Sequence, residues 1–287
     1  MSAPWVRLLR PHQYTKNLLV FAAPGAAARL DEGDTLLRAI TAFALFCAIS
    51  SAGYVVNDLT DASADRRHPE KRHRPIASGA VSEKVGRNLL VALLVVTAAI
   101  APTLGGWFVL ATAGYAITTF SYSLALKQVP WLELVLVSSG FVVRAAAGAA
   151  ATDVEPSGWF LVVVSAGALL VIAGKRLGEL VTLGQDTLSR PVLRHYSASS
   201  LQFFAGASAA TATVAYAAWA IADASNRAGD DRFLRLTIVP FVAALLRYLD
   251  LCRRGRGEAP DVIVFRDPWM LLAGVVWVAL YATGLYS

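Results

Sequence analysis

Long apolar stretches separated by short polar connections dominate the chain. Windows of roughly 17 to 25 mostly apolar residues, bounded by charge, Pro or Gly, predict helices that can cross a bilayer. Nine such helices cover residues 15–30, 35–56, 84–103, 105–124, 131–151, 157–178, 196–222, 233–252 and 268–286. The first is the weakest, because Pro24 and Gly25 interrupt it, so we expect a broken or partly interfacial helix there. The pattern predicts an all-α multi-spanning membrane protein, with residues 1–287 as one transmembrane domain.

Composition and charge agree with this fold class and set its orientation. The chain is 56% hydrophobic and 16% charged, with a mean hydropathy of +0.53. Most of its 26 Lys and Arg lie on one side of the predicted spans, together with the N-terminal arm. The positive-inside rule therefore predicts a plasma (inner) membrane protein with a cytoplasmic N-terminus, and it explains a pI near 9.5 without a nucleic-acid partner. The opposite connections, such as RLDEGD and TDVEPS, are short and acidic, so the chemistry is expected to face the cytoplasm.

The sequence argues against a cleaved signal peptide, a disulfide framework and a histidine metal site. The N-terminal residues lead into no small-residue cleavage site, so we expect the N-terminus to be retained. Two cysteines are too few for a disulfide framework, and the four histidines show no metal-ligand spacing.

The connection after the second predicted helix, NDLTDASADRRHPEKRHRPIASG at residues 57–79, is the most polar segment of an apolar chain. Asn57, Asp61 and Asp65 recur at intervals of four, so all three point from one face if the helix extends past the membrane. Such a row of oxygen ligands suits Mg²⁺, which is usually held by one or two carboxylates together with substrate phosphates. Asp58 lies on an adjacent face, as a ligand or as a partner of one.

The bases that follow these acids suit a metal that carries phosphates. Guanidinium groups bind phosphate oxygens in pairs, and Lys offers a point charge. The predicted contacts to the phosphates of the donor substrate are Arg66, Lys71, Arg72 and Arg74. The alternative is an ordinary loop whose bases fix topology and attract anionic lipid. That alternative does not require a helical row of Asn and Asp.

The motif NDxxDxxxD, formed by Asn57, Asp58, Asp61 and Asp65, resembles the first signature of the UbiA superfamily of intramembrane prenyltransferases. Three further segments resemble a branch of this superfamily that transfers phosphoribosyl groups in actinobacterial cell-wall synthesis: PHQYTKNLLVFAAP, DRRHPEKRHRPIASG and RYLDLCRRGRGEAPDVIVFRDP. The resemblance implies nine transmembrane helices, with a cytoplasmic polar cap over an intramembrane cavity.

The same resemblance implies an activity. The enzyme would transfer 5-phosphoribosyl from phosphoribosyl pyrophosphate to a polyprenyl phosphate, normally decaprenyl phosphate, for arabinogalactan synthesis, and would release pyrophosphate. Asp58, Asp61 and Asp65 would be catalytic, with Mg²⁺ held by Asn57, Asp61 and Asp65. Membrane lipids would surround the protein, and the resemblance also allows a homo-oligomer.

A second polar cluster departs from the ordinary family pattern. Where a prenyltransferase has its second aspartate-rich motif, this chain reads AGKRLGEL, with Lys175, Arg176 and Glu179. Bases in place of acids suit direct contact with a phosphate, and Glu179 could orient Lys175 or reach a sugar hydroxyl. The alternative is a pair of bases that stabilises a helix C-terminus.

Further substrate contacts are expected at isolated polar positions, each with a structural alternative. Lys16 and Asn17 suit a phosphate, with Lys16 grouped with Lys175 and Arg176 for the acceptor phosphate or the ribose 5-phosphate; interfacial anchoring is the alternative. Tyr122 and Lys127 end another span, where an aromatic belt and a snorkelling Lys are equally typical.

Two more charged positions complete the set of predicted contacts. Arg144 lies inside the fifth predicted span, where a charge is costly, so it is expected to pair with Glu133 or to approach the anionic substrate. Asp261 matches an acidic position of the resembled family, and an exposed loop acid is the alternative.

Two other functions stay open at this point. An ordinary prenyltransferase would move a prenyl group from a prenyl diphosphate to an aromatic or other acceptor, and the missing second aspartate pair disfavours it. A lipid or solute transporter would use intramembrane charge without chemistry, and the clustered cytoplasmic motif disfavours that function.

Overall fold

The computed structural model describes residues 3–124, 126, 129–183, 191–226, 232–257 and 260–286. The described residues form helices and connections without a strand. The chain divides into two compact units, Met1–Lys127 with Val143–Glu155, and Gln128–Val142 with Pro156–Ser287. One domain over residues 1–287 stays a prediction.

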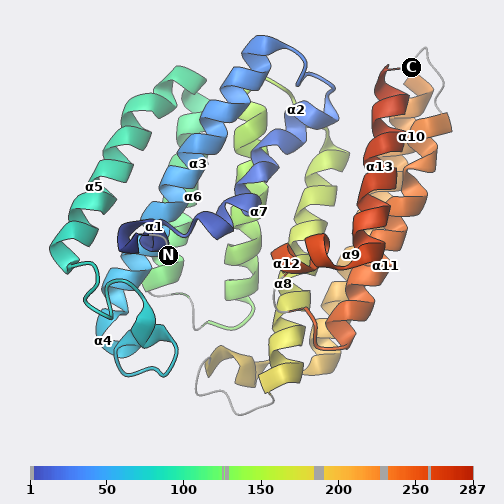
Figure 1. The fold of residues 1–287 in the computed structure, drawn as a ribbon. Coiled ribbons are helices and arrows are strands. Elements are labelled where there is room, and N and C mark those ends of the chain that lie inside the picture. The colour runs from blue at the N-terminus through green and yellow to red at the C-terminus, as the bar shows by residue number, and fades with distance from the viewer. Residues whose placement is uncertain are drawn as a thin grey trace. The chain divides into compact units, whose positions relative to one another are not determined.

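Unit 1 is built around the long helix α3 (Figure 1). Its elements are α1 (Pro4–Leu9), η1 (Pro11–Phe21), α2 (Ala22–Ala26), α3 (Gly33–Thr60), α4 (Ala62–Asp65), η2 (Lys71–His73), α5 (Glu83–Ile100), η3 (Ala101–Leu104), α6 (Gly106–Leu124) and the second half of α7 (Leu132–Ala151). Helix α3 packs against α5, α6, α1 and η1. Phe46 of α3 lies at the centre of the apolar core, with ring centroids 6.0 Å from Phe108 and 5.4 Å from Tyr115.

Unit 2 begins with the first half of α7 and contains the remaining helices. They are α8 (Gly158–Leu183), η5 (Pro191–His195), α9 (Ala198–Asn226), α10 (Arg232–Leu236), α11 (Ile238–Arg253), α12 (Pro260–Arg266) and α13 (Pro268–Tyr286). Helices α8, α9 and α11 pack together around a core that includes Leu177, Leu201 and Tyr248.

The predicted apolar runs correspond closely to these helices, and the first of them is broken as expected, although the break lies between Phe21 and Ala22 while α2 runs through Pro24 and Gly25. The segment Pro11–Phe21 is a 3₁₀ helix, which the apolar pattern does not distinguish from an α-helix. Among the described residues, five helices are long and apolar enough to cross a membrane: Gly33–Thr60, Glu83–Leu104, Leu132–Ala151, Gly158–Thr182 and Ala198–Ala222. An all-α membrane fold is thus confirmed, whereas nine crossings, the cytoplasmic cap and the cavity stay predictions.

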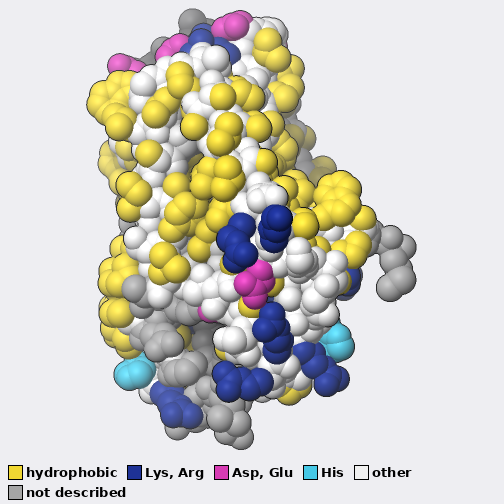
Figure 2. All heavy atoms as spheres, turned by 90° about the vertical axis from the view of Figure 1, so that its left-hand side faces the viewer, with side chains coloured by type: hydrophobic (Ala, Val, Ile, Leu, Met, Phe, Trp, Pro, Cys, Tyr) yellow, Lys and Arg dark blue, Asp and Glu magenta, His cyan; other side chains and the backbone are white. Residues whose placement is uncertain are grey.

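The surface of unit 1 separates apolar from charged residues. Figure 2 faces the side on which α5 lies and shows hydrophobic side chains over much of this face, with Lys and Arg gathered toward its lower end. The connection from α4 to α5 supplies exposed bases there, including Arg66, Arg67 and Arg72. This separation is typical of a protein whose apolar faces meet lipid.

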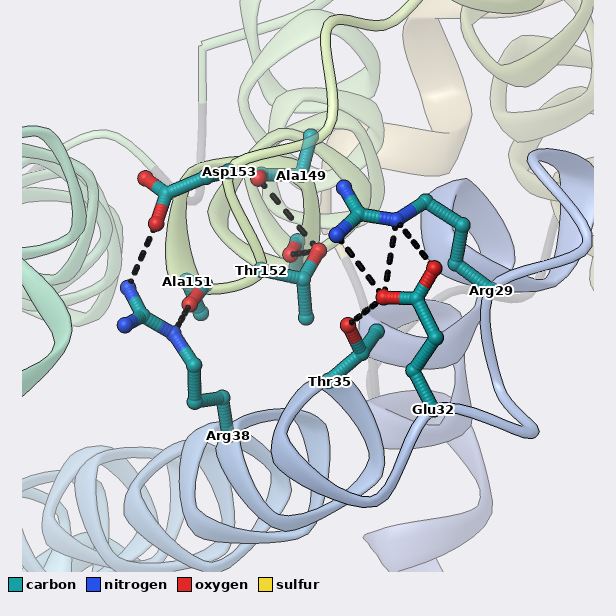
Figure 3. A network of polar contacts seen from close by, with 9 residues as sticks. Arg29, Glu32, Thr35, Arg38, Ala149, Ala151, Thr152 and Asp153 are labelled. Carbon is teal, nitrogen blue, oxygen red and sulfur yellow. Dashed lines mark hydrogen bonds and ion pairs between the residues drawn. The ribbon is translucent and has the colours of Figure 1, made fainter.

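The opposite end of α3 is fixed by a separate polar network (Figure 3). Arg38 donates to the Ala151 carbonyl at 2.5 Å and pairs with Asp153 at 2.9 Å, so the start of α3 is joined to the end of α7. Glu32 accepts from Arg29 and Thr35, each at 2.8 Å. Since α3 has 28 residues, about 40 Å separate this network from the acidic end of the helix.

Candidate functional site

The acidic motif lies at the C-terminal end of α3 and continues the helical path. Helix α3 extends through Thr60, Asp61 caps it, and α4 follows directly. The backbone N–H of Asp61 donates to the Asn57 carbonyl at 2.9 Å, and that of Asp65 to the Asp61 carbonyl at 2.8 Å. The predicted helical spacing of Asn57, Asp61 and Asp65 is therefore present in the backbone.

Asp58 is the most deeply buried acid of the motif. Its Oδ1 accepts a hydrogen bond from Arg10 at 2.6 Å, and Arg74 lies 3.4 Å from the same oxygen. Arg74 also donates to Asp65 Oδ2 at 2.7 Å. We call Asp58, Asp65, Arg10 and Arg74 the aspartate–arginine cluster. It places two buried carboxylates beside two guanidinium groups at the polar end of α3.

Arg10 is the member of the cluster that sequence reasoning missed. It stands between α1 and η1 in the left-handed region, with φ of 52°, and its guanidinium lies 4.9 Å from the centre of the Tyr54 ring. Ser51 fixes the arm on α3, because its hydroxyl donates to the Leu9 carbonyl at 2.9 Å and bonds Tyr14 at 3.0 Å. The only sequence signal for Arg10 was its membership of the basic N-terminal arm.

Of the remaining predicted donor-phosphate bases, Arg66 and Arg72 are exposed, whereas Lys71 is half-buried like Arg74. Arg66 pairs with Glu83 at 3.4 Å, and both side chains are about half exposed, so this contact contributes little stability. Arg72 is exposed beside His73, and Lys71 is half-buried. Phosphate binding by these residues stays a prediction.

A buried polar network surrounds Arg144 in unit 1. Arg144 Nε donates to Asn17 Oδ1 at 2.7 Å, and its Nη2 donates to the Tyr115 hydroxyl at 2.8 Å. Asn17 in turn donates to Ser50 at 3.2 Å and to the Cys47 sulfur at 3.3 Å. We call these five residues the Arg144 network. The neighbouring Lys16 is half-buried and donates to Gln13.

The second predicted cluster lies in unit 2. Its centre is Arg176, which contacts two glutamates. Arg176 forms a two-point pair with Glu133, with Nε–Oε1 of 2.6 Å and Nη2–Oε2 of 2.8 Å. Its Nη1 donates to Glu179 at 2.7 Å, while Lys175 is half-buried on α8. The alternative partners predicted for Arg144 included Glu133; the structure places Glu133 on Arg176 and Arg144 in its own network.

Three further predicted residues are placed only in part. Tyr122 is half-buried near the end of α6. Lys127 lies outside the described residues, and Asp261 is the second residue of α12, with a side chain that is not among those described. Their roles stay predictions.

The chemistry of the acidic end fits a magnesium ion that shares its ligands with a substrate. Within the described part of the chain, no group of three or more His, Cys, Asp or Glu side chains could hold a metal by itself. Mg²⁺ does not need such a cage, because it is usually held by one or two carboxylates, waters and substrate phosphates. Asp58 Oδ2 is buried without a hydrogen-bond partner, which leaves one carboxylate oxygen for a ligand.

An ion pair between Arg247 of α11 and Asp267, the residue before α13, joins these two helices. The predicted Asp261 lies between them in the chain. The closest contact is 2.7 Å, and Asp267 also accepts from the Met270 backbone N–H at 3.0 Å, as the N-cap of α13. The hydrogen bond from Arg247, together with those from the backbone, holds the pKa of Asp267 below its usual range.

We expect Asp267→Ala to destabilise the protein by about 1 kcal/mol, the usual cost of losing a helix N-cap. Because the pKa is lowered on folding, the carboxylate contributes stability at neutral pH that fades as pH falls through the folded pKa. Unfolding in detergent, followed from pH 7 downward, should show the difference from the unaltered protein narrowing. Asp267→Asn keeps a cap and removes the ion pair, so it should fall between the two; a loss independent of pH would contradict this account.

Known proteins provide an independent comparison. The family model described as "UbiA prenyltransferase family" matches residues 18–176. The chain is 35% identical over 293 residues to decaprenyl-phosphate phosphoribosyltransferase of Mycolicibacterium smegmatis, covering 98% of this chain and 92% of the relative. It is 33% identical to decaprenyl-phosphate phosphoribosyltransferase of Corynebacterium glutamicum, covering 98% and 86%.

Solved structures show the same fold. A UbiA homolog from Archaeoglobus fulgidus bound to GPP and Mg²⁺ is similar with a TM-score of 0.73 at 18% identity, covering 98% of each chain. The homolog bound to DMAPP and Mg²⁺ is equally similar, with a TM-score of 0.73 over the full length of both chains. At this identity the likeness concerns the fold alone.

Proposed function

Because this chain belongs to the UbiA prenyltransferase family and is an integral membrane protein, we propose that it transfers 5-phosphoribosyl from phosphoribosyl pyrophosphate to polyprenyl phosphate. Decaprenyl phosphate is the proposed acceptor, and pyrophosphate is the leaving group. The observation that carries this proposal is the 35% identity, over nearly the whole chain, to a relative named for that reaction. We place the enzyme in the plasma membrane, with its N-terminus and acidic motif on the cytoplasmic side.

The aspartate–arginine cluster supports a multiply anionic donor. Its two acids and two Arg nearly balance in charge, so the cluster alone gives a free divalent cation little net attraction. A cation that arrives with a diphosphate satisfies both kinds of side chain, because the carboxylates bind metal and the guanidinium groups bind phosphate oxygens. We therefore propose that donor and Mg²⁺ bind together.

The sequence predicts Asn57, Asp61 and Asp65 as metal ligands; we propose that Asn57 and Asp61 keep this role and that Asp58 takes the place of Asp65, because Arg74 already donates to Asp65 at 2.7 Å. Asp58 offers its buried, unpartnered Oδ2, and the two others are half-buried on the same helix end. Mg²⁺ bound there would neutralise charge on the departing pyrophosphate. Asp65 would hold Arg74 in place, and Arg74 would position donor phosphates.

The acceptor needs little chemical activation, because its phosphate is already an anion. Catalysis would then consist of holding the anomeric carbon of the donor close to that phosphate and of stabilising the charge that develops. In unit 2 we propose that Arg176 orients Glu133 and Glu179, so that Glu179 can accept from a ribose hydroxyl while Lys175 binds a phosphate.

The test is an assay of purified protein in detergent with labelled phosphoribosyl pyrophosphate and decaprenyl phosphate. We expect lipid-linked ribose phosphate and pyrophosphate to form in equal amounts, and both to disappear when EDTA replaces Mg²⁺. Consumption of a prenyl diphosphate with an aromatic acceptor, without phosphoribosyl transfer, would favour an ordinary prenyltransferase. No product with either donor would favour a transporter.

A further inference from the structure

Segment η1 has a conformation that needs outside support. It is a 3₁₀ helix of 11 residues, whereas isolated 3₁₀ runs longer than three or four residues are uncommon. Because this helix has three residues per turn, side chains three apart lie above one another. Tyr14, Asn17 and Val20 therefore form one edge; Tyr14 bonds Ser51 of α3, and the other two are fully buried.

The second half of α7 holds this edge at two points. Arg144 and Gly148 are four residues apart, so they lie on one face of α7. Arg144 donates to Asn17, three residues before Val20. At Gly148, an added Cβ would lie 1.9 Å from the Val20 carbonyl oxygen, so α7 passes directly against the η1 backbone. The spacing on one helix thus matches the spacing on the other.

The contact to Asn17 also fixes the direction of its amide. Asn17 Oδ1 accepts from Arg144, so its Nδ2 is directed to Ser50 and Cys47 of α3. Asn17 therefore joins η1 to both α3 and α7 through a single side chain. Lys16, the residue before Asn17, lies on the adjacent edge of η1. There it donates to Gln13, which is one 3₁₀ turn earlier in the chain.

We propose that Arg144 is a positioning residue, which holds η1 in its 3₁₀ form through Asn17 so that Lys16 meets a substrate phosphate. Arg144 is only 6% exposed and is bonded to Asn17 and Tyr115, so it acts through its neighbours. The inference rests on the proposed function, which supplies two phosphate-bearing substrates. The phosphate at Lys16 belongs either to phosphoribosyl pyrophosphate or to the polyprenyl phosphate.

Steady-state kinetics of Arg144→Met separates positioning from a structural role. We expect KM for one of the two substrates to rise about tenfold or more, the usual effect of losing a hydrogen bond to a charged group, while kcat changes little. The substrate whose KM changes identifies the phosphate at Lys16. A structural role would instead lower the active fraction and therefore kcat, with both KM values unchanged.

Three more variants make the test specific. Asn17→Ala should reproduce the KM change, and it decides the question if Arg144→Met does not fold. Adding Arg144→Met to Lys16→Met should raise KM by less than about twofold, because the two changes remove one interaction. Thr112→Val is the matched control, since it removes a buried hydroxyl whose hydrogen bonds stay within α6 and leaves the Arg144 network in place; its KM values should stay near those of the unaltered protein.

The outcomes for the inference and for the function are distinct. If the unaltered protein forms no phosphoribosyl product, the proposed function fails. If it is active but folded Arg144→Met or Asn17→Ala keeps both KM values, the positioning role is overturned. Full additivity of Arg144→Met with Lys16→Met would also overturn it.

Discussion

Asp58→Asn is expected to reduce phosphoribosyl transfer by about 10- to 100-fold, the range seen when residues around a metal site are replaced. The amide keeps the size of the side chain but loses the charge that faces Arg10 and Arg74. It also places either an oxygen without charge or an NH₂ group where the unpartnered Oδ2 lies. The variant therefore loses both the metal ligand and the anchor of two Arg side chains.

The measurement is kcat/KM for phosphoribosyl pyrophosphate at saturating Mg²⁺ and at a series of lower concentrations. We expect the apparent Mg²⁺ requirement to rise together with KM for the donor, because donor and metal bind as one unit. Asp34→Asn is the matched control, since Asp34 is an exposed acid in the first turn of the same helix. Asp58→Asn with an activity near that of the control would contradict the metal site.

The acidic motif could be predicted because its signal is local. Spacing by four places Asn57, Asp61 and Asp65 on one helical face whatever packs nearby, and the backbone continues through Asp61 as expected. The burial of Asp58 was not predictable in the same way. It depends on Arg10, which is 48 residues distant in sequence, and on the docking of the N-terminal arm against Ser51.

The first predicted helix likewise combines a feature that the local sequence predicts with one that depends on distant partners. Pro24 and Gly25 predict a break in this helix, and the structure has one three residues before Pro24, where η1 ends at Phe21 and α2 begins. Its 3₁₀ form is decided by partners in α3 and α7, above all the close approach at Gly148. An apolar pattern over so few residues does not separate a period of 3.0 from one of 3.6.

The partners of intramembrane charges were the least predictable feature. By sequence, Arg144 and Glu133 are acceptable partners for each other. Both lie in the same predicted span, where an unpaired charge costs free energy. The structure instead gives Arg144 an amide and a phenol, and gives Glu133 the guanidinium of Arg176. Which charges meet depends on helix packing, and the sequence pattern carries no direct information about it.

Glu133→Gln is expected to destabilise the protein by about 3–5 kcal/mol, which is the usual cost of removing one charge of a buried ion pair and leaving the other uncompensated. Glu133 is fully buried and the Arg176 side chain is 3% exposed, so water cannot replace the lost charge. Glu179 remains as a partner, but it contacts a different nitrogen of Arg176. Unfolding in detergent measures the loss.

Glu83→Gln is the matched control for this prediction, because it breaks the half-exposed pair with Arg66 and should cost less than about 1 kcal/mol. The double variant Glu133→Leu with Arg176→Met should be more stable than Glu133→Gln, since it removes both charges of the fully buried pair. Glu179 then loses its contact with Arg176, but its side chain is 13% exposed and can turn to solvent. If Glu133→Gln behaved like Glu83→Gln, the pair would be solvated rather than buried, and Arg176 would be available to bind a phosphate directly.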